Sequence, residues 1–208
     1  MAFLSLFFLF CCKKREAKPL KKLDETSKNY TKFEVNSTWI YQLKGQTNTD
    51  TCKITVVRSG TSLSSKLDYD YEAHETQMTS TYHNKKTWAS TEARPDADGV
   101  CIHNLWFDGA RTSTKCVFFS NRSVGDAYNY WYYPDNIVTY QSYLPTYVLE
   151  GKTYNEVMVF ESRYTGASVS FDDVRLPIKT WFAKNIGIIR KEMKNGEIWN
   201  LISHDVKQ

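Results

Sequence analysis

Alternation of apolar and polar residues with a period of two is the feature that most constrains the fold of this chain. It dominates from Phe33 onward, and it is typical of strands with one face in a core and the other in solvent. No stretch shows a convincing amphipathic helical stripe. The pattern predicts strands over 38–44, 52–58, 63–73, 75–83, 100–107, 111–119, 136–143, 154–164, 178–191 and 197–203. Turn dipeptides such as Asp108-Gly109 and Asn195-Gly196 separate them, so we predict one mainly β domain of antiparallel strands.

Composition supports a single folded domain and excludes two classes of protein. Of 208 residues, 41% are hydrophobic and 15% aromatic, enough to build a core. No apolar run reaches 18 residues, which excludes a polytopic membrane protein. Six basic residues and one acidic residue lie within 1–22, leaving 21 basic and 22 acidic residues, a net charge of −1, in the rest. The body therefore lacks the cationic excess of nucleic-acid-binding proteins.

The first twelve residues read MAFLSLFFLFCC and precede a basic cluster. A helix of this length spans about 18 Å, too short for a bilayer core of ~30 Å, but the length suits the apolar region of a secretory signal. Leu9-Phe10-Cys11-Cys12 resembles a bacterial lipobox in which Cys12 is the lipidated residue. An ordinary cleavable signal with two incidental cysteines is the alternative.

This interpretation divides the chain into a lipoprotein-type signal segment (1–12), a flexible basic tether (13–32) and a single β domain (33–208). The tether is charged, contains Pro19 and lacks apolar periodicity. Acyl chains on Cys12 would anchor the protein in a membrane. The residues after Cys12 are basic, unlike the acidic surface-export signals of some Gram-negative lipoproteins. We therefore expect an outer-membrane location facing the periplasm, with a secreted protein as the alternative.

Two cysteines flank the Asp108-Gly109 turn. If that dipeptide forms a two-residue loop, Cys101 and Cys116 are paired across the hairpin, within disulfide range. An oxidising compartment would preserve such a bond. A redox or metal pair is the other interpretation, but it lacks the CxxC spacing, so we predict a structural disulfide.

The C-terminal third carries a family-like pattern. YNEVMVFE at 154–161 is followed by TWFAKNIGIIRKE at 180–192 and NGEIWNLI at 195–202. Over residues 150–203 this order resembles a group of poorly characterised Gram-negative envelope lipoproteins, whose fold is similar to the half-barrel sheets of lipoprotein-carrier and lipoprotein-localisation proteins. The resemblance implies a single curved antiparallel sheet with little helix, a cell-envelope setting and no catalytic residues.

Three N-x-S/T sequons, at Asn29, Asn36 and Asn121, keep a second architecture open. They would suit a closed, lipocalin-like barrel in a eukaryotic secreted protein. No Gly-x-Trp lipocalin signature lies near Trp39, and the lipobox-like segment would be unexplained. We therefore favour the half-barrel.

Sequence motifs for enzymatic chemistry are missing. His74, His83, His103 and His204 are scattered without HExxH or HxH spacing, and no GxSxG, GxGxxG or phosphate-binding loop occurs. We predict no metal site, no cofactor and no catalytic residues.

One strand segment offers closely spaced carboxylates. Asp68, Asp70 and Glu72 share one face, and Tyr69 and Tyr71 the other. Paired carboxylates can act as acid and base or bind Ca²⁺. A solvent-facing polar edge with inward tyrosines is the simpler interpretation, and we favour it.

The densest aromatic cluster suggests a ligand-binding surface. Aromatic side chains can stack on sugars or line an apolar pocket, although they also fill cores. The candidates are Tyr128, Tyr130, Trp131, Tyr132 and Tyr133, together with Trp181 of the C-terminal motif.

Taken together, these features predict a membrane-anchored envelope lipoprotein with a non-catalytic β domain that binds an apolar or envelope-derived ligand, or a partner protein. Two alternatives remain. One is a purely structural or interaction module. The other is a carbohydrate-active hydrolase using Asp68 and Asp70.

Overall fold

The computed structural model describes residues 17–63, 68–82, 85–93, 101–107, 115–129, 136–164 and 177–208. Cys12, Asp108-Gly109 and Tyr130 to Tyr133 lie outside these ranges. The described elements are β1 Leu20–Lys21, α1 Glu25–Thr31, β2 Thr38–Leu43, β3 Thr49–Ser62, β4 Asp70–Ser80, β5 Lys85–Glu92, β6 Ile102–Phe107, β7 Lys115–Phe119, β8 Ala127–Asn129, β9 Asn136–Leu149, β10 Lys152–Tyr164, β11 Pro177–Ala183, β12 Gly187–Met193 and β13 Ile198–Asp205. No helix within these ranges is long and apolar enough to cross a bilayer.

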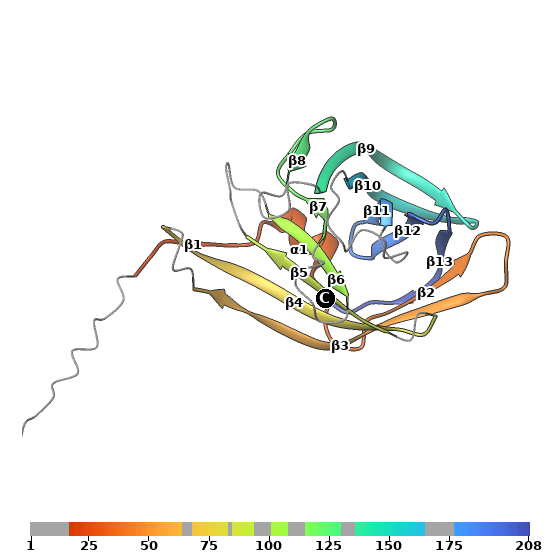
Figure 1. Ribbon diagram of the computed structural model, residues 1–208, viewed down its shortest axis with the longest axis horizontal. Helices are drawn as coiled ribbons and strands as arrows, with labels where there is room; N and C mark the ends of the chain where they lie inside the picture. Colours follow the sequence, from red (N-terminus) through yellow and green to blue (C-terminus); the bar gives the residue numbers. More distant parts are fainter. Residues whose placement is uncertain are drawn as a thin grey trace, which may run out of the picture.

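One strongly curved antiparallel sheet forms the body of the molecule (Figure 1). Its strand order is β7-β6-β5-β4-β3-β2-β13-β12-β11-β10-β9-β8, with β1 added in parallel to β4. The pairing of β2 with β13 joins the two halves of the chain in the middle of the sheet. The predicted fold class, a curved antiparallel sheet with little helix, is confirmed.

The two ends of the sheet approach each other, so the sheet nearly closes into a barrel. The Cys116 amide of β7 donates a hydrogen bond to Asn136 Oδ1 of β9 at 2.7 Å. Thr180 Oγ1 of β11 donates to the Val117 carbonyl of β7 at 3.5 Å. These bonds satisfy buried polar groups at a place where no strand ladder joins the two ends.

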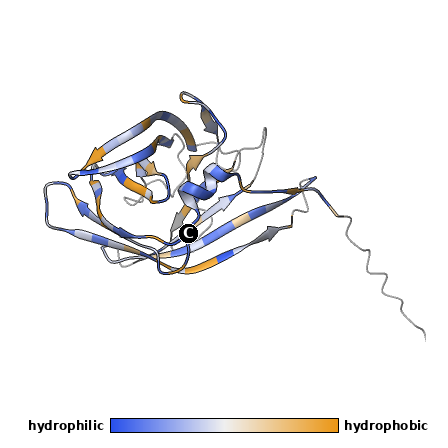
Figure 2. Cartoon of the chain, turned by 180° about the vertical axis from the view of Figure 1, so that it is seen from behind, coloured by the Kyte–Doolittle hydropathy of each residue, from blue (hydrophilic) through white to orange (hydrophobic). Residues whose placement is uncertain are grey.

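Alternation along the strands builds the core, and Figure 2 shows hydrophobic and hydrophilic residues following one another along them. In β2, Trp39, Tyr41 and Leu43 are buried, whereas the residues between them are half-buried. Aromatic rings dominate the other half of the core: Phe118 lies 4.9 Å from Phe160 between centroids. Burying one such ring contributes roughly 1.5–3 kcal/mol to folding.

Helix α1 corrects the prediction of a flexible tether up to residue 32. Asp24 caps it by accepting a hydrogen bond from the Ser27 amide at 2.6 Å. The buried Tyr30 hydroxyl donates to the Glu156 carbonyl of β10 at 2.6 Å, and the buried Thr31 hydroxyl contacts β5. The helix thus bridges two distant stretches of the sheet, and the folded domain includes residues from at least Leu20 onward.

The strand predicted over 178–191 is instead a hairpin. β11 ends at Ala183, and β12 begins at Gly187, whose φ is +88°. A Cβ on this glycine would lie 3.0 Å from Phe33 Cε2, so the turn requires glycine for both conformation and space.

A turn occurs at Asn195-Gly196 as predicted, but it is not the two-residue type I′ loop that an Asn-Gly dipeptide favours. Only Gly196 of that pair has a positive φ, whereas Glu150 and Gly151 have φ values of +49° and +73° between the paired residues Leu149 and Lys152. Both central residues of a type I′ turn need positive φ, so Glu150-Gly151 is the two-residue hairpin.

Candidate ligand-binding cavity

A cavity of about 120 Å³ lies between the curved halves of the sheet. Alternate residues of β4, namely Thr76, Met78 and Ser80, follow its length along one wall. Ala89 and Leu105 continue this wall onto β5 and β6, because Ala89 is the cross-strand neighbour of Thr76 and Leu105 is that of Ala89. The inward face of several paired strands therefore forms the wall.

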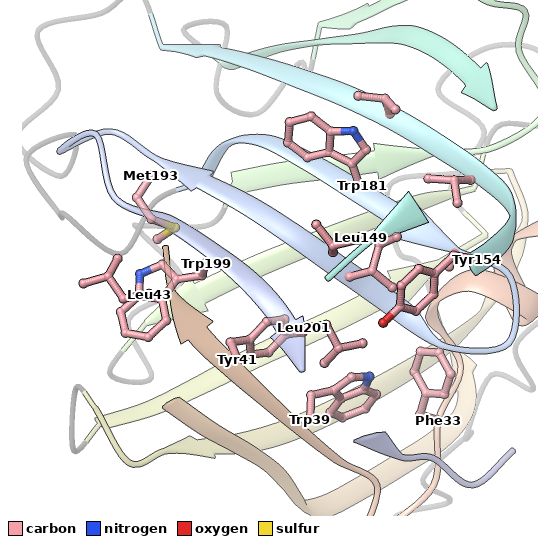
Figure 3. Close-up of a cluster of buried hydrophobic side chains, with 14 of the residues drawn as sticks. Phe33, Trp39, Tyr41, Leu43, Leu149, Tyr154, Trp181, Met193, Trp199 and Leu201 are labelled. Atoms are coloured by element: carbon pink, nitrogen blue, oxygen red, sulfur yellow. The ribbon is translucent and has the colours of Figure 1, made fainter. Parts of the chain in front are cut away.

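Aromatic side chains of β2 and of the segment before it also line the cavity, and their polar atoms are already hydrogen-bonded. Trp39 Nε1 donates to the Ile186 carbonyl at 2.6 Å, and the Tyr41 hydroxyl donates to the Ile188 carbonyl at 2.8 Å. Phe33 packs edge-on against Trp39 at 5.3 Å between centroids. Figure 3 shows these rings in one buried cluster. With those donors satisfied, the rings offer apolar surface to an occupant.

A buried ion pair lies at one end of the cavity. Asp50, 1% exposed, is 3.6 Å from Lys191 Nζ and accepts hydrogen bonds from Ser80 Oγ at 2.8 Å and from the Tyr82 amide at 3.3 Å. Burial raises the pKa of Asp50, but the charge of Lys191 and these hydrogen bonds outweigh it and hold the pKa below its ordinary value. Lys191 also lies 4.4 Å from the centre of the Tyr41 ring.

Cys52 lines the same end but is not a nucleophile. Burial, aided by the nearby Asp50 charge, raises the pKa of its thiol to about 12 against the opposing effect of Lys191. The thiolate is the reactive form of cysteine, so this side chain stays protonated and inert near neutral pH.

A chain of hydrogen bonds lies at the other end, where α1 meets the sheet. His103 Nδ1 is 2.8 Å from Thr91 Oγ1, which is 2.9 Å from Thr31 Oγ1. Thr31 Oγ1 donates to the Ser27 carbonyl at 2.6 Å. Burial lowers the pKa of His103 to about 3, so its imidazole is neutral at physiological pH.

The aromatic residues predicted to bind a ligand do not line this cavity where they are described. Trp181 is 8% exposed, and Arg190 and Lys179 lie 4.7 and 5.2 Å from its ring centre. Figure 3 shows it apart from Phe33 and Trp39. Tyr128 is half-buried and packs against Phe119 at 5.8 Å between centroids.

Sequence reasoning missed most of the cavity residues. Thr76, Thr87 and Ala89 are small or polar and carry no motif, and His103 looked like one of four scattered histidines. The strand register places His74, Thr91 and His103 in one cross-strand row. The sequence alone does not give this register, so the three residues could not be grouped in advance.

The carboxylates of the 68–72 segment do not form a site either. Asp70 is buried opposite Leu20, and Glu72 Oε2 accepts a hydrogen bond from the Leu23 amide at 3.1 Å. Neither lines the cavity. Among the described residues, no group of three or more His, Cys, Asp or Glu side chains could hold a metal ion.

The predicted disulfide between Cys101 and Cys116 is wrong in this structure, where both are buried free thiols. The register pairs Cys116 with Asn104, and the Cys101 carbonyl accepts a hydrogen bond from the Ser120 amide at 2.9 Å. Asn104 lies three residues from Cys101, and the register shift between His103 and Asn104 adds one residue to this offset, so the two thiols do not face each other.

No family model matches the chain, and comparison with curated proteins and with solved structures finds no match. The functional argument therefore depends on the geometry of this cavity and on the sequence.

Proposed function

We propose that this protein is a membrane-anchored envelope lipoprotein whose barrel binds a small apolar ligand. The observation that supports ligand binding is the cavity of about 120 Å³, walled by Trp39, Tyr41 and Met78. An unfilled cavity of this size is destabilising by about 3 kcal/mol, which a matching apolar occupant offsets. Its volume suits a single ring or a short acyl segment.

The anchored, envelope part of the proposal depends on sequence patterns. They are the lipobox-like Leu9-Phe10-Cys11-Cys12 and the resemblance of residues 150–203 to Gram-negative envelope lipoproteins. Acylation of Cys12 would place the barrel at a membrane surface, where apolar molecules are available to it.

The cavity does not favour a carbohydrate hydrolase. Among its described lining residues Asp50 is the single carboxylate, and it is paired with Lys191. Hydrolysis of a glycosidic bond ordinarily needs two carboxyl groups facing each other across the substrate.

Ligand binding is tested by filling the cavity. Ala89, 2% exposed, lines the wall, so Ala89→Met should occupy the space and weaken binding of toluene, as a probe, at least tenfold. Ala127→Met adds the same side chain at an exposed position of β8 and should leave toluene affinity unchanged. Ligand-observed NMR titration gives both dissociation constants. If wild type does not bind toluene, or if the two variants bind it equally, the cavity is not the binding site.

The anchor is tested separately by mass spectrometry of full-length protein extracted from membranes of a Gram-negative host. We expect the mass of the mature wild-type chain to match acylation at Cys12. Cys12→Ser should lack this increment and leave the membrane fraction. A wild-type chain without acylation would overturn the anchor and leave the cavity proposal standing.

A further inference from the structure

Two buried histidines in the same cross-strand row have different hydrogen-bond environments. His74 Nε2 lies 3.1 Å from the Phe33 carbonyl, and its Nδ1 lies 2.7 Å from Ser59 Oγ. A carbonyl only accepts, so His74 carries its proton on Nε2, and the serine hydroxyl donates to Nδ1. Both ring nitrogens of His74 are therefore satisfied.

His103 carries its proton on the other ring nitrogen. The Ser27 carbonyl can only accept, so Thr31 uses its hydroxyl hydrogen there. Thr91 must then donate its single hydroxyl hydrogen to Thr31 Oγ1, and the bond between Thr91 and His103 needs a proton from Nδ1. The donor order thus fixes the neutral Nδ1–H tautomer and leaves a lone pair on Nε2.

The described residues give His103 one hydrogen-bond contact, at Nδ1, and none at Nε2. His103 is 93% buried and lines the cavity beside Leu105 and Phe182, so Nε2 is an acceptor in an apolar setting. A donor on an occupant of the cavity would supply the hydrogen bond that no described residue makes to Nε2.

We propose that the cavity selects an apolar ligand that carries a hydrogen-bond donor, a hydroxyl or N–H group, which binds His103 Nε2. The inference rests on the proposed binding function and specifies its ligand class. A carboxylate would meet the lone pair of a neutral imidazole, and the cation at the far end, Lys191, is already paired with Asp50. Ionised fatty acids are therefore disfavoured relative to alcohols and phenols.

The tautomer is tested first, in the free protein. Two-bond ¹H–¹⁵N correlation of the histidine rings distinguishes protonated from unprotonated nitrogens, and the spectrum of His103→Phe assigns the His103 signals. We expect a protonated Nδ1 and an unprotonated Nε2 from pH 6 to 8, with the Nε2 signal shifting on addition of phenol. A protonated Nε2 in the free protein overturns the inference, and so does an Nε2 signal that phenol leaves unchanged.

Ligand selection is tested with phenol and toluene, which are nearly isosteric and differ in one donor. The ratio of their dissociation constants, measured by NMR titration, should shift against phenol by about five- to tenfold in His103→Phe. Thr91→Val removes the hydrogen-bond acceptor of His103 Nδ1 but changes no residue that lines the cavity. It should shift the ratio of the phenol and toluene dissociation constants in the same direction. Melting temperatures establish that each variant is folded.

The outcomes separate the two proposals. If neither phenol nor toluene binds wild type, the proposed ligand-binding function fails. If both bind but the phenol-to-toluene ratio is unchanged in both variants, apolar binding stands and the role of His103 is overturned.

Discussion

At the scale of single residues, the walls of the cavity are mainly apolar because most polar atoms around it already have hydrogen-bond or ion-pair partners. Tyr30, Trp39 and Tyr41 direct their donors to backbone carbonyls, and Asp50 is paired with Lys191. Each of these groups would otherwise face an apolar space without a partner, at a cost that exceeds the gain from a typical hydrogen bond.

The neutral state of His103 makes the stability of the protein depend on pH. Its pKa is about 3 in the folded chain and near 6.5 when unfolded, so protons bind preferentially to the unfolded state below pH 6.5. Stability is fully present above pH 6.5 and is lost as pH falls toward 3. We expect His103 to remove about 2 kcal/mol of unfolding free energy between pH 7 and pH 5.

Urea denaturation of wild type and His103→Phe at both pH values measures this contribution. The variant should lose about 2 kcal/mol less than wild type over the interval, and the difference cancels any uniform destabilisation by the substitution. His74, whose pKa is also lowered by burial, still titrates in both proteins. Equal losses in the two proteins would contradict a buried neutral His103.

At the scale of elements, strands with large apolar residues on one face were predicted well, whereas β5, which faces the cavity with small and polar residues, was not. β5 directs Thr87, Ala89 and Thr91 inward, so its sequence lacks hydrophobic contrast between faces, and no strand was predicted there. α1 was missed because two of its three buried residues are polar, although Asp24 is a recognisable cap.

The turn between β11 and β12 should be sensitive to any side chain at its glycine. Gly187→Ala combines a strained φ of +88° with a Cβ 3.0 Å from Phe33, and we expect a loss of about 2–4 kcal/mol. Gly45→Ala is the matched control, because its φ is +77° but nothing lies within 4 Å, so about 1 kcal/mol is expected. Denaturant unfolding compares the two; equal losses would mean that Phe33 shifts freely.

At the scale of the whole molecule, near-closure of the sheet depends on contacts remote in sequence. β2 pairs with β13, α1 bridges β5 and β10, and the Cys116 amide joins β7 to Asn136 of β9. Each contact closes a long stretch of chain, whose entropic cost must be offset by burial of the core.

The residues before Phe33 should therefore be needed for stability. Relative to a chain beginning at residue 17, a chain beginning at residue 33 lacks α1 and exposes the core where Tyr30 and Thr31 pack. We expect loss of cooperative unfolding, or a decrease in unfolding free energy of at least about 3 kcal/mol, since removing one buried aromatic ring already costs this much. Thermal melting followed by circular dichroism gives the comparison, and matching melting temperatures would restore the tether interpretation.

The sequence by itself determined that the chain is mainly β, because period-two alternation is a local property that needs no knowledge of partners. It also determined the turn at Asn195-Gly196 and the apolar character of β2. Only the tertiary structure decided the register that separates Cys101 from Cys116, the place of α1 in the core and the row that brings Thr91 to His103. These depend on pairing between distant segments, where a bulge of one residue changes every neighbour beyond it.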